Sequence, residues 1–273
     1  MRKCKGWPVS ACSWSLRTDI GQVIEVLRQL DVGYVHLAAR PALEENGKAY
    51  LDAVRKSRLK ISALMIDFPS EDYTTLETIR RTGGIIPDAP WETNKKLALG
   101  AIALAGKLGV KLLSLHCGFL EHTEKGYDKK LLGRVALLAD AAKKKGVKLL
   151  METGQEAAEE LKHFMETVNH PALAINFDPA NMILYDKGNP IEAVRVLGKW
   201  IRHVHAKDAV KTATPGTWGT EVPWGEGQVN TAGFLQALES VGFKGALAIE
   251  REAGDDRAGD IRKAAERLSA FGG

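Results

Sequence analysis

The chain has 273 residues, of which 45% are hydrophobic and 26% charged, and its formal net charge is +4. These values are those of an ordinary globular protein, and the charge is too small to indicate a nucleic-acid-binding protein. No apolar run approaches the roughly 20 residues that a membrane span needs, so we expect neither nucleic acid nor a membrane as a partner.

The cysteines and the first residues point to a location inside the cell. Cys4, Cys12 and Cys117 are odd in number and have no paired spacing, which argues against a disulfide framework. The basic first residues lack the apolar stretch of a signal peptide. We therefore expect a cytoplasmic protein.

Short apolar or β-branched runs alternate along the chain with longer helical patterns. The predicted strands are residues 9–14, 34–38, 61–66, 111–117, 147–152, 173–178, 201–207 and 246–250. The predicted helical regions are 18–30, 41–57, 71–107, 129–145, 155–168, 190–199, 231–241 and 256–270. Asp19 and Thr231 are the expected caps of two of these helices, and Pro190 suits a first turn.

Eight strand–helix units predict a parallel sheet that closes into a single (β/α)₈ TIM barrel, with residues 1–273 as one domain. A doubly wound sheet is the competing fold, but no Gly-x-Gly-x-x-Gly follows the first strand. Two long connections, 67–91 and 208–230, follow strands. Long connections of this kind are usually lids or binding loops.

Four late strands end in residues that can bind a metal ion: Glu152, Asp178, His205 and Glu250. Each has an ordinary explanation when taken alone, such as a helix cap, a turn before Pro179 or a buried histidine. Together they would place three carboxylates at one barrel mouth, where they repel one another unless a cation neutralises them. The pattern therefore predicts a divalent metal site. Its oxygen-rich donors favour Mn²⁺, Mg²⁺ or Co²⁺, and Zn²⁺ is also compatible.

Five motifs carry a family resemblance. They are METGQE at 151–156, NFDPAN at 176–181, HVHAKD at 203–208, WGEG at 224–227 and IERE at 249–252. With these motifs the chain resembles the xylose isomerase-like TIM barrel superfamily of sugar isomerases and epimerases. That superfamily also contains hydroxypyruvate isomerases, inosose-processing enzymes and endonuclease IV.

The resemblance implies roles for the four residues. Glu152, Asp178, His205 and Glu250 match the metal ligands of the family, with Mn²⁺ as the favoured ion. Glu152 and Glu250 match the catalytic acid/base pair of its epimerases. The implied activity is isomerisation or epimerisation of a small ketose or related polyol ketone through an enediolate. Two alternatives stay open: a lyase or dehydratase acting on a 3-keto-sugar or keto-glycoside, and a sugar-binding barrel without turnover.

The chain departs from the epimerase pattern at two positions. Asn181 stands where the epimerases have a histidine, and Lys211 stands where they have a substrate-contacting arginine. The identity of the substrate is therefore open. Endonuclease IV needs a histidine-rich site for three zinc ions, and His36 and His116 add too few ligands for one.

Several further residues are candidates for contact with a small sugar substrate. His116 ends its strand and should face the barrel mouth. The remaining candidates are Trp14, Asn181, His203, Lys207, Asp208, Lys211 and Trp224. The same sequence is compatible with a homo-oligomer.

Overall fold

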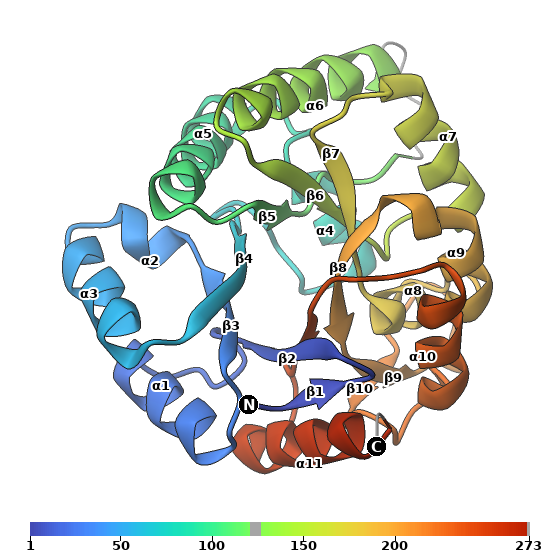
Figure 1. Cartoon of the computed structure of the whole chain (residues 1–273). Coiled ribbons are helices and arrows are strands. Elements are labelled where there is room, and N and C mark those ends of the chain that lie inside the picture. Colours follow the sequence, from blue (N-terminus) through green and yellow to red (C-terminus); the bar gives the residue numbers. More distant parts are fainter. Residues whose placement is uncertain (121–126, 272–273) are drawn as a thin grey trace.

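Eight parallel strands close into a barrel, and helices surround it (Figure 1). The computed structural model describes residues 1–120 and 127–271. The strands pair in the order β2-β11-β8-β7-β6-β5-β4-β3, and a pairing of β2 with β3 closes the sheet. The predicted (β/α)₈ barrel is confirmed.

All eight predicted strands are present, with their ends shifted by at most a few residues. The barrel strands are β2 Trp7–Cys12, β3 Tyr34–Ala38, β4 Lys60–Met65, β5 Leu112–Leu115, β6 Lys148–Glu152, β7 Leu173–Phe177, β8 Ile201–Ala206 and β11 Leu247–Ile249. Three short strands lie outside the barrel: β1 Lys3–Cys4, β9 Asp208–Val210 and β10 Thr220–Val222. The last two form an antiparallel pair inside the long connection after β8, which the sequence did not predict.

The helices follow the predicted order. They are α1 Ile20–Gln29, α2 Arg40–Leu43, α3 Gly47–Ser57, α4 Leu76–Thr82, α5 Trp91–Leu108, α6 Tyr127–Lys144, α7 Ala158–Val168, α8 Pro179–Leu184, α9 Pro190–Leu197, α10 Thr231–Ser240 and α11 Arg257–Ala270, with a 3₁₀ turn at Gly198–Trp200. Among the described residues, no helix is both long enough and apolar enough to cross a membrane.

Two predicted helical regions are broken in the structure. The region 41–57 divides into α2 and α3, and the region 71–107 divides into α4 and α5. At the second break Gly84 has φ +72°, and a Cβ there would lie 2.3 Å from the backbone carbon of Cys117. Only glycine can make this close approach, so the helix ends and the chain turns towards the barrel.

The helix ends test the predicted caps. Asp19 accepts backbone hydrogen bonds at the start of α1, and Pro190 occupies the first turn of α9, as predicted. The expected cap of α10 was wrong, because Asn230 and not Thr231 accepts the N–H of Gly233. α8 was not predicted, since Pro179 after Asp178 was interpreted as a turn.

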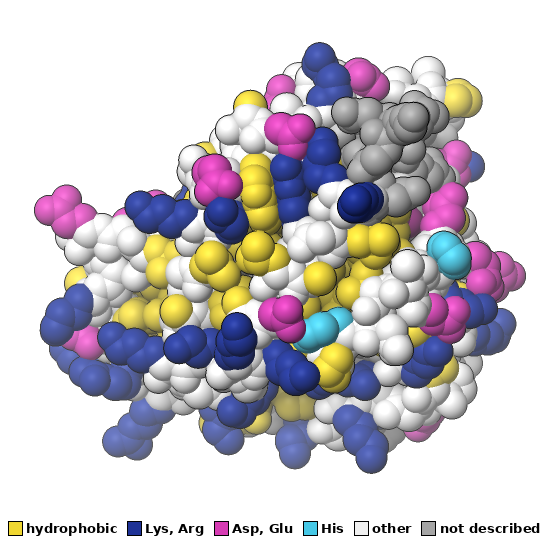
Figure 2. Space-filling model, turned by 90° about the horizontal axis from the view of Figure 1, so that it is seen from above, with side chains coloured by type: hydrophobic (Ala, Val, Ile, Leu, Met, Phe, Trp, Pro, Cys, Tyr) yellow, Lys and Arg dark blue, Asp and Glu magenta, His cyan; other side chains and the backbone are white. Residues whose placement is uncertain are grey.

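Many Lys and Arg side chains lie on the surface, and some of them lie at helix ends. Figure 2 looks from above Figure 1, where α5 and α6 lie, and shows Lys and Arg side chains spread in a band with hydrophobic side chains between them. α5 ends with Lys107 in its last turn, and α6 ends with Lys143 and Lys144. Cations at these ends interact favourably with the helix dipoles.

Candidate metal centre

The four predicted metal-binding residues meet at the carboxyl ends of neighbouring strands. Glu152 ends β6, Asp178 follows β7, His205 lies in β8 and Glu250 follows β11. All four are at most 5% exposed. The strands of a parallel barrel point the same way, so these residues come together at one mouth although they are far apart in sequence.

The donor atoms converge on the imidazole of His205. Its Nδ1 lies 3.0 Å from Glu152 Oε1, 3.4 Å from Asp178 Oδ2 and 3.2 Å from Glu250 Oε2. Donors that share an ion at about 2.1 Å, at right to tetrahedral angles, lie roughly 3.0–3.4 Å apart. The three distances to Nδ1 lie in this range, and all four donor atoms lie within 4.8 Å of one another, so the four residues could share one ion.

Buried polar atoms without partners mark the same point. Glu152 Oε2, Asp178 Oδ2 and His205 Nδ1 are shielded from solvent, and none makes a hydrogen bond. Buried polar groups usually find partners, since desolvation is otherwise costly. A divalent cation is the group that these residues fit.

Neighbouring groups hold two of the donors in place. Asp178 caps α8 through Oδ1, which accepts the N–H of Asn181 at 2.9 Å and leaves Oδ2 directed at the centre. His205 Nε2 lies 3.1 Å from His36 Nδ1. Asn176 Nδ2 lies at the same distance, 3.1 Å, from His205 Nε2, so two neighbours fix the plane of this imidazole. Burial lowers the pKa of His36 to about 3, so His36 is neutral.

The pKa values at the centre show a competition between burial and charge. Burial lowers the pKa of His205, but Glu250 and Glu152 outweigh it and raise the pKa well above 6.5. Burial raises the pKa of Glu250, but His205 and Lys207 hold it well below 4.5. At Asp178 burial dominates and raises the pKa above 3.8. The positive charges of His205 and Lys207 thus offset the repulsion among the three carboxylates.

Lys207 supplies part of that charge. Its Nζ lies 2.9 Å from Glu250 Oε2, 2.6 Å from Glu252 Oε2 and 3.9 Å from Asp178 Oδ2. Burial opposes the ammonium form, but the acids outweigh burial and raise the pKa of Lys207 well above 10.5. Lys207 is therefore a buried cation that holds Glu250 ionised.

Replacing Lys207 with methionine should destabilise the metal-free protein at pH 7 by about 3–5 kcal/mol, because a buried pair loses its cation. Added Mn²⁺ should recover much of the loss. Chemical denaturation with and without the ion measures both effects. Lys211→Met is the control, since the Lys211–Asp186 pair is exposed and should contribute at most about 1 kcal/mol. Equal losses in the two variants would contradict this account of Lys207.

The Lys207→Met substitution should also change how the free energy of unfolding depends on pH below pH 5. Glu250 has a folded pKa below its ordinary 4.5, so it contributes stability that is present above pH 4.5 and is lost as the pH falls through the folded pKa. Without Lys207 that pKa rises towards 4.5 and the contribution shrinks. The metal-free Lys207→Met protein should therefore lose less stability between pH 5 and pH 3 than the unsubstituted protein loses.

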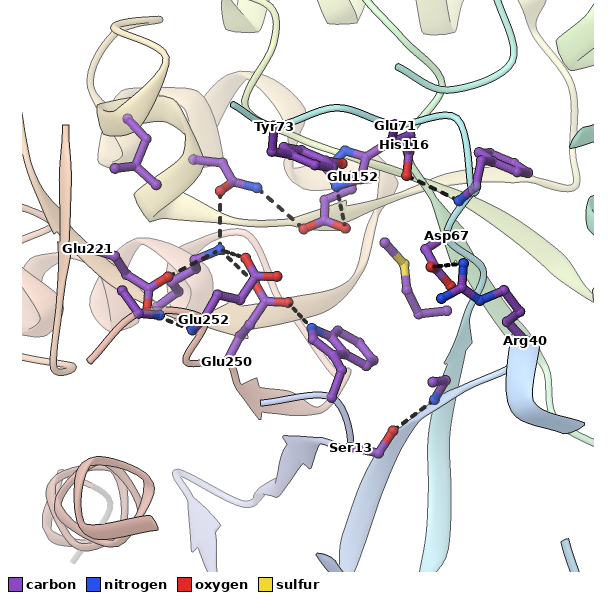
Figure 3. A pocket seen from close by; sticks show the side chains of 18 of the residues that line it. Ser13, Arg40, Asp67, Glu71, Tyr73, His116, Glu152, Glu221, Glu250 and Glu252 are labelled. Carbon is purple, nitrogen blue, oxygen red and sulfur yellow. Dashed lines mark hydrogen bonds and ion pairs between the residues drawn. The ribbon is translucent and has the colours of Figure 1, made fainter. Parts of the chain in front are cut away.

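A cavity of about 900 Å³ opens above the four residues. Figure 3 shows Glu152 and Glu250 within it, Glu221 and Glu252 on one side, and Arg40 and Asp67 on the other. The connection after β8 contributes Glu221, as expected for a long connection at this face. The centre is thus accessible to a small molecule.

The comparisons with known proteins agree with the barrel fold. A model of the xylose isomerase-like TIM barrel family matches residues 24–271. The chain belongs to this family. A xylose isomerase domain protein from Planctomyces limnophilus is 30% identical, with 97% of this chain and 96% of that chain covered and a TM-score of 0.86. The sequence has no match among curated proteins.

Two more distant structures share the fold of this family member. A xylose isomerase-like TIM barrel protein from Mycobacterium smegmatis in complex with magnesium is 16% identical, with a TM-score of 0.77 and coverage of 99% and 98%. A D-allulose 3-epimerase from Methylomonas sp. in complex with D-allulose is also 16% identical, with a TM-score of 0.72 and coverage of 99% of each chain. At 16% identity these two structures support the barrel fold of this chain and nothing about its activity.

In this xylose isomerase-like barrel, four of the predicted substrate contacts line the cavity: Trp14, His116, Asn181 and Lys207. Trp14 Nε1 donates to Glu250 Oε1 at 2.8 Å, and Asn181 Nδ2 donates to Glu152 Oε1 at 3.3 Å. His116 Nε2 lies 3.6 Å from Glu152 Oε2, and its Nδ1 has no hydrogen-bond partner. These four residues surround the two glutamates.

The structure does not bring the other four candidates to the cavity wall. His203 lies deeper in the barrel, 2.9 Å from Asn176 Oδ1 and 3.1 Å from Ser62 Oγ. Lys211 is exposed and paired with Asp186. Trp224 is 4% exposed and packs against Phe234.

Asp208, the last of the four, supports a loop. Its carboxylate accepts the backbone N–H groups of Ala209, Gly225, Gly227 and Val229, so it shapes the connection between β8 and α10. A buried carboxylate with these partners holds the backbone that carries Glu221 towards the cavity.

Several acidic and aromatic residues of the cavity wall were not predicted from the sequence, among them Glu221, Glu252 and Tyr185. Glu221 Oε1 accepts hydrogen bonds from Arg251 Nη1 at 2.6 Å and from the backbone N–H of Glu252 at 2.8 Å. The available signals were the IERE motif, which contains Glu252, and the long connection that contains Glu221. Neither signal shows which side chains face inward.

Proposed function

We propose that this barrel is a divalent-metal-dependent isomerase or epimerase of a small ketose or a related polyol ketone. The observation that carries the proposal is the placement of Glu152 and Glu250. Each carboxylate lies within 3.2 Å of His205 Nδ1, and both line one cavity from strands separated by β7 and β8. A ketone bound between them has a proton carrier on each side.

The reaction needs a base, an acid and stabilisation of negative charge. One carboxylate takes a proton from the carbon beside the carbonyl, and the electrons of the C–H bond form an enediolate. The other carboxylate returns a proton, on the opposite face for epimerisation. A divalent ion held by Glu152, Asp178, His205 and Glu250 would stabilise the negative oxygen atoms.

The neighbours of the two glutamates give them different roles. Lys207 and Trp14 both donate to Glu250, which favours its ionised form as an acceptor of a proton. Glu152 Oε2 is free of hydrogen bonds and lies beside His116, which lines the cavity and can exchange a proton with it. We therefore expect Glu152 to be the carboxylate that exchanges its proton with solvent between turnovers.

Two relatives support the proposal through the ligands in their structures. The protein from M. smegmatis was solved with magnesium, and the epimerase from Methylomonas was solved with D-allulose. Both have the barrel of this chain. We infer the same ligand classes here, with Mn²⁺ as the expected ion because the donors are three carboxylates and one imidazole.

Incubation with ketoses in D₂O tests the proposal. With Mn²⁺ present, NMR should show deuterium at the carbon beside the carbonyl of at least one ketose, with an unchanged molecular formula. Release of water or of a fragment would instead show a lyase that uses the same proton abstraction. A sugar that binds without any exchange would contradict turnover and support a binding protein.

A further inference from the structure

The cavity is chemically divided into two halves. The half next to β5, β6, β7, β8 and β11 is lined by Glu152, Glu250, Lys207, His116 and further acids. The half next to β2, β3 and β4 has an apolar wall formed by Trp14, Ala38, Pro41, Met65, Phe68 and Pro69. Its polar lining residues are Ser13, Thr18, Arg40, Tyr50 and Asp67. In Figure 3, Arg40 and Asp67 mark the far end of this second half.

Unpaired polar atoms lie in the acid-rich half. Three described residues of the cavity wall have a buried polar atom without a hydrogen-bond partner, and they are His116, Glu152 and Trp218. None of these comes from β2, β3 or β4. Sugar hydroxyl groups would find their partners in the acid-rich half.

The polar side chains of the apolar half already have partners within the protein, and Thr18 Oγ1 donates to Gln22 Oε1. Ser13 Oγ accepts the N–H of Ala38 at 2.9 Å, and Tyr50 donates to the carbonyl of Ala38 at 3.0 Å. Arg40 and Asp67 form an ion pair of 2.9 Å at the far end. A ligand group in this half would therefore contact mostly carbon atoms.

The size of the cavity exceeds what a single sugar needs. At about 900 Å³ it is near the upper end of the roughly 300–1,000 Å³ typical of pockets that enclose drug-sized molecules. A free hexose has only six carbons and six oxygens. A hexose in the acid-rich half would leave the apolar half in contact with water.

We propose that the apolar half is a second subsite that binds an apolar aglycone, an aromatic or alkyl group attached to the keto-sugar. The inference rests on the proposed function, because the sugar part is anchored at the acid-rich half. It narrows the substrate class from free ketoses to keto-glycosides. Burial of the aglycone against Met65 and Phe68 would supply hydrophobic binding energy that a free ketose lacks.

Two ligands that differ only in the aglycone test the subsite: phenyl and methyl 3-keto-β-D-glucopyranoside. Their Kd values for the Mn²⁺-supplied protein can be measured by stopped-flow tryptophan fluorescence before turnover, since Trp14 lines the cavity. We expect the phenyl glycoside to bind at least about tenfold more tightly. Ala38→Phe should fill the subsite and reduce this preference to about one, whereas Ala38→Gly should keep it.

A second substitution tests the same wall independently, in case the Ala38→Phe protein does not fold. Met65→Gln keeps the length of the side chain but makes the wall polar, so the preference should fall here as well. Equal Kd values for the two glycosides in the unsubstituted protein would overturn the subsite and leave the proposed function intact. Absence of binding by both, in protein shown to be folded and loaded with Mn²⁺, would also overturn the subsite. The proposed function would fail separately, if no ketose in the D₂O panel exchanged a proton.

Discussion

Asp178→Ala protein is expected to lose its divalent ion and the stability that the ion supplies. Asp178 is fully buried, and its Oδ2 has no hydrogen-bond partner, lying 3.4 Å from His205 Nδ1. Changes in residues that only orient metal ligands typically cost 10–100-fold in affinity, so loss of a ligand should cost more than about 100-fold. Metal analysis of protein purified without chelator should give about one ion per unsubstituted chain and almost none in the variant.

Thermal denaturation provides the second measurement for this substitution. An ion that binds only the folded chain, at about 1,000 times its Kd, stabilises it by about 4 kcal/mol. Mn²⁺ should therefore raise the Tm of the unsubstituted protein by several degrees and leave that of Asp178→Ala unchanged. Asp186→Ala is the matched control, because Asp186 is exposed and pairs only with Lys211 among the described residues. Equal metal content in Asp178→Ala and the control would refute the site.

Glu152→Gln and Glu250→Gln should each slow epimerisation by about 10²–10⁴-fold, the usual contribution of a positioned acid or base. The amide oxygen of glutamine can still bind the ion. The amide cannot act as a base, so it cannot take the proton from the substrate carbon. The two carboxylates are supported by different neighbours, Asn181 and His116 beside Glu152, and Trp14 and Lys207 beside Glu250. Each should therefore serve one face of the substrate.

The measurement is epimerisation and deuterium exchange on a ketose identified in the D₂O panel, with Mn²⁺ in excess. A protein that keeps one glutamate should still exchange the proton on that face far faster than it epimerises. Glu226→Gln is the control, because Glu226 is half-exposed and pairs with Arg267 away from the cavity. Unchanged epimerisation in either active-site variant, with the ion still bound, would exclude that glutamate as a proton carrier.

The sequence by itself determined the barrel and the four residues at its mouth. Apolar runs of strand length alternate with helical patterns, and a polar residue at the end of such a run can be located without any structure. The parallel direction of the strands then fixes that Glu152, Asp178, His205 and Glu250 share one face. The same argument places His116 near them, as the structure confirms.

Only the tertiary structure decided which neighbours complete the cavity. His203 and His205 are two residues apart and point to the same side of β8, yet His203 lies one layer deeper, against Ser62 and Asn176. Asp208 and Trp224 belong to motifs of the family, but one binds loop backbone and the other packs in the core.

The physical reason is the range of the forces involved. Strand periodicity and helix caps are local, so the chain order reveals them. The approach of Gly154 to Asn181, which places an amide beside Glu152, depends instead on contacts between segments far apart: a Cβ on Gly154 would lie 2.3 Å from Asn181 Cβ. The division of the cavity into an acid-rich and an apolar half arises in the same way, since strands from opposite ends of the chain form its two walls.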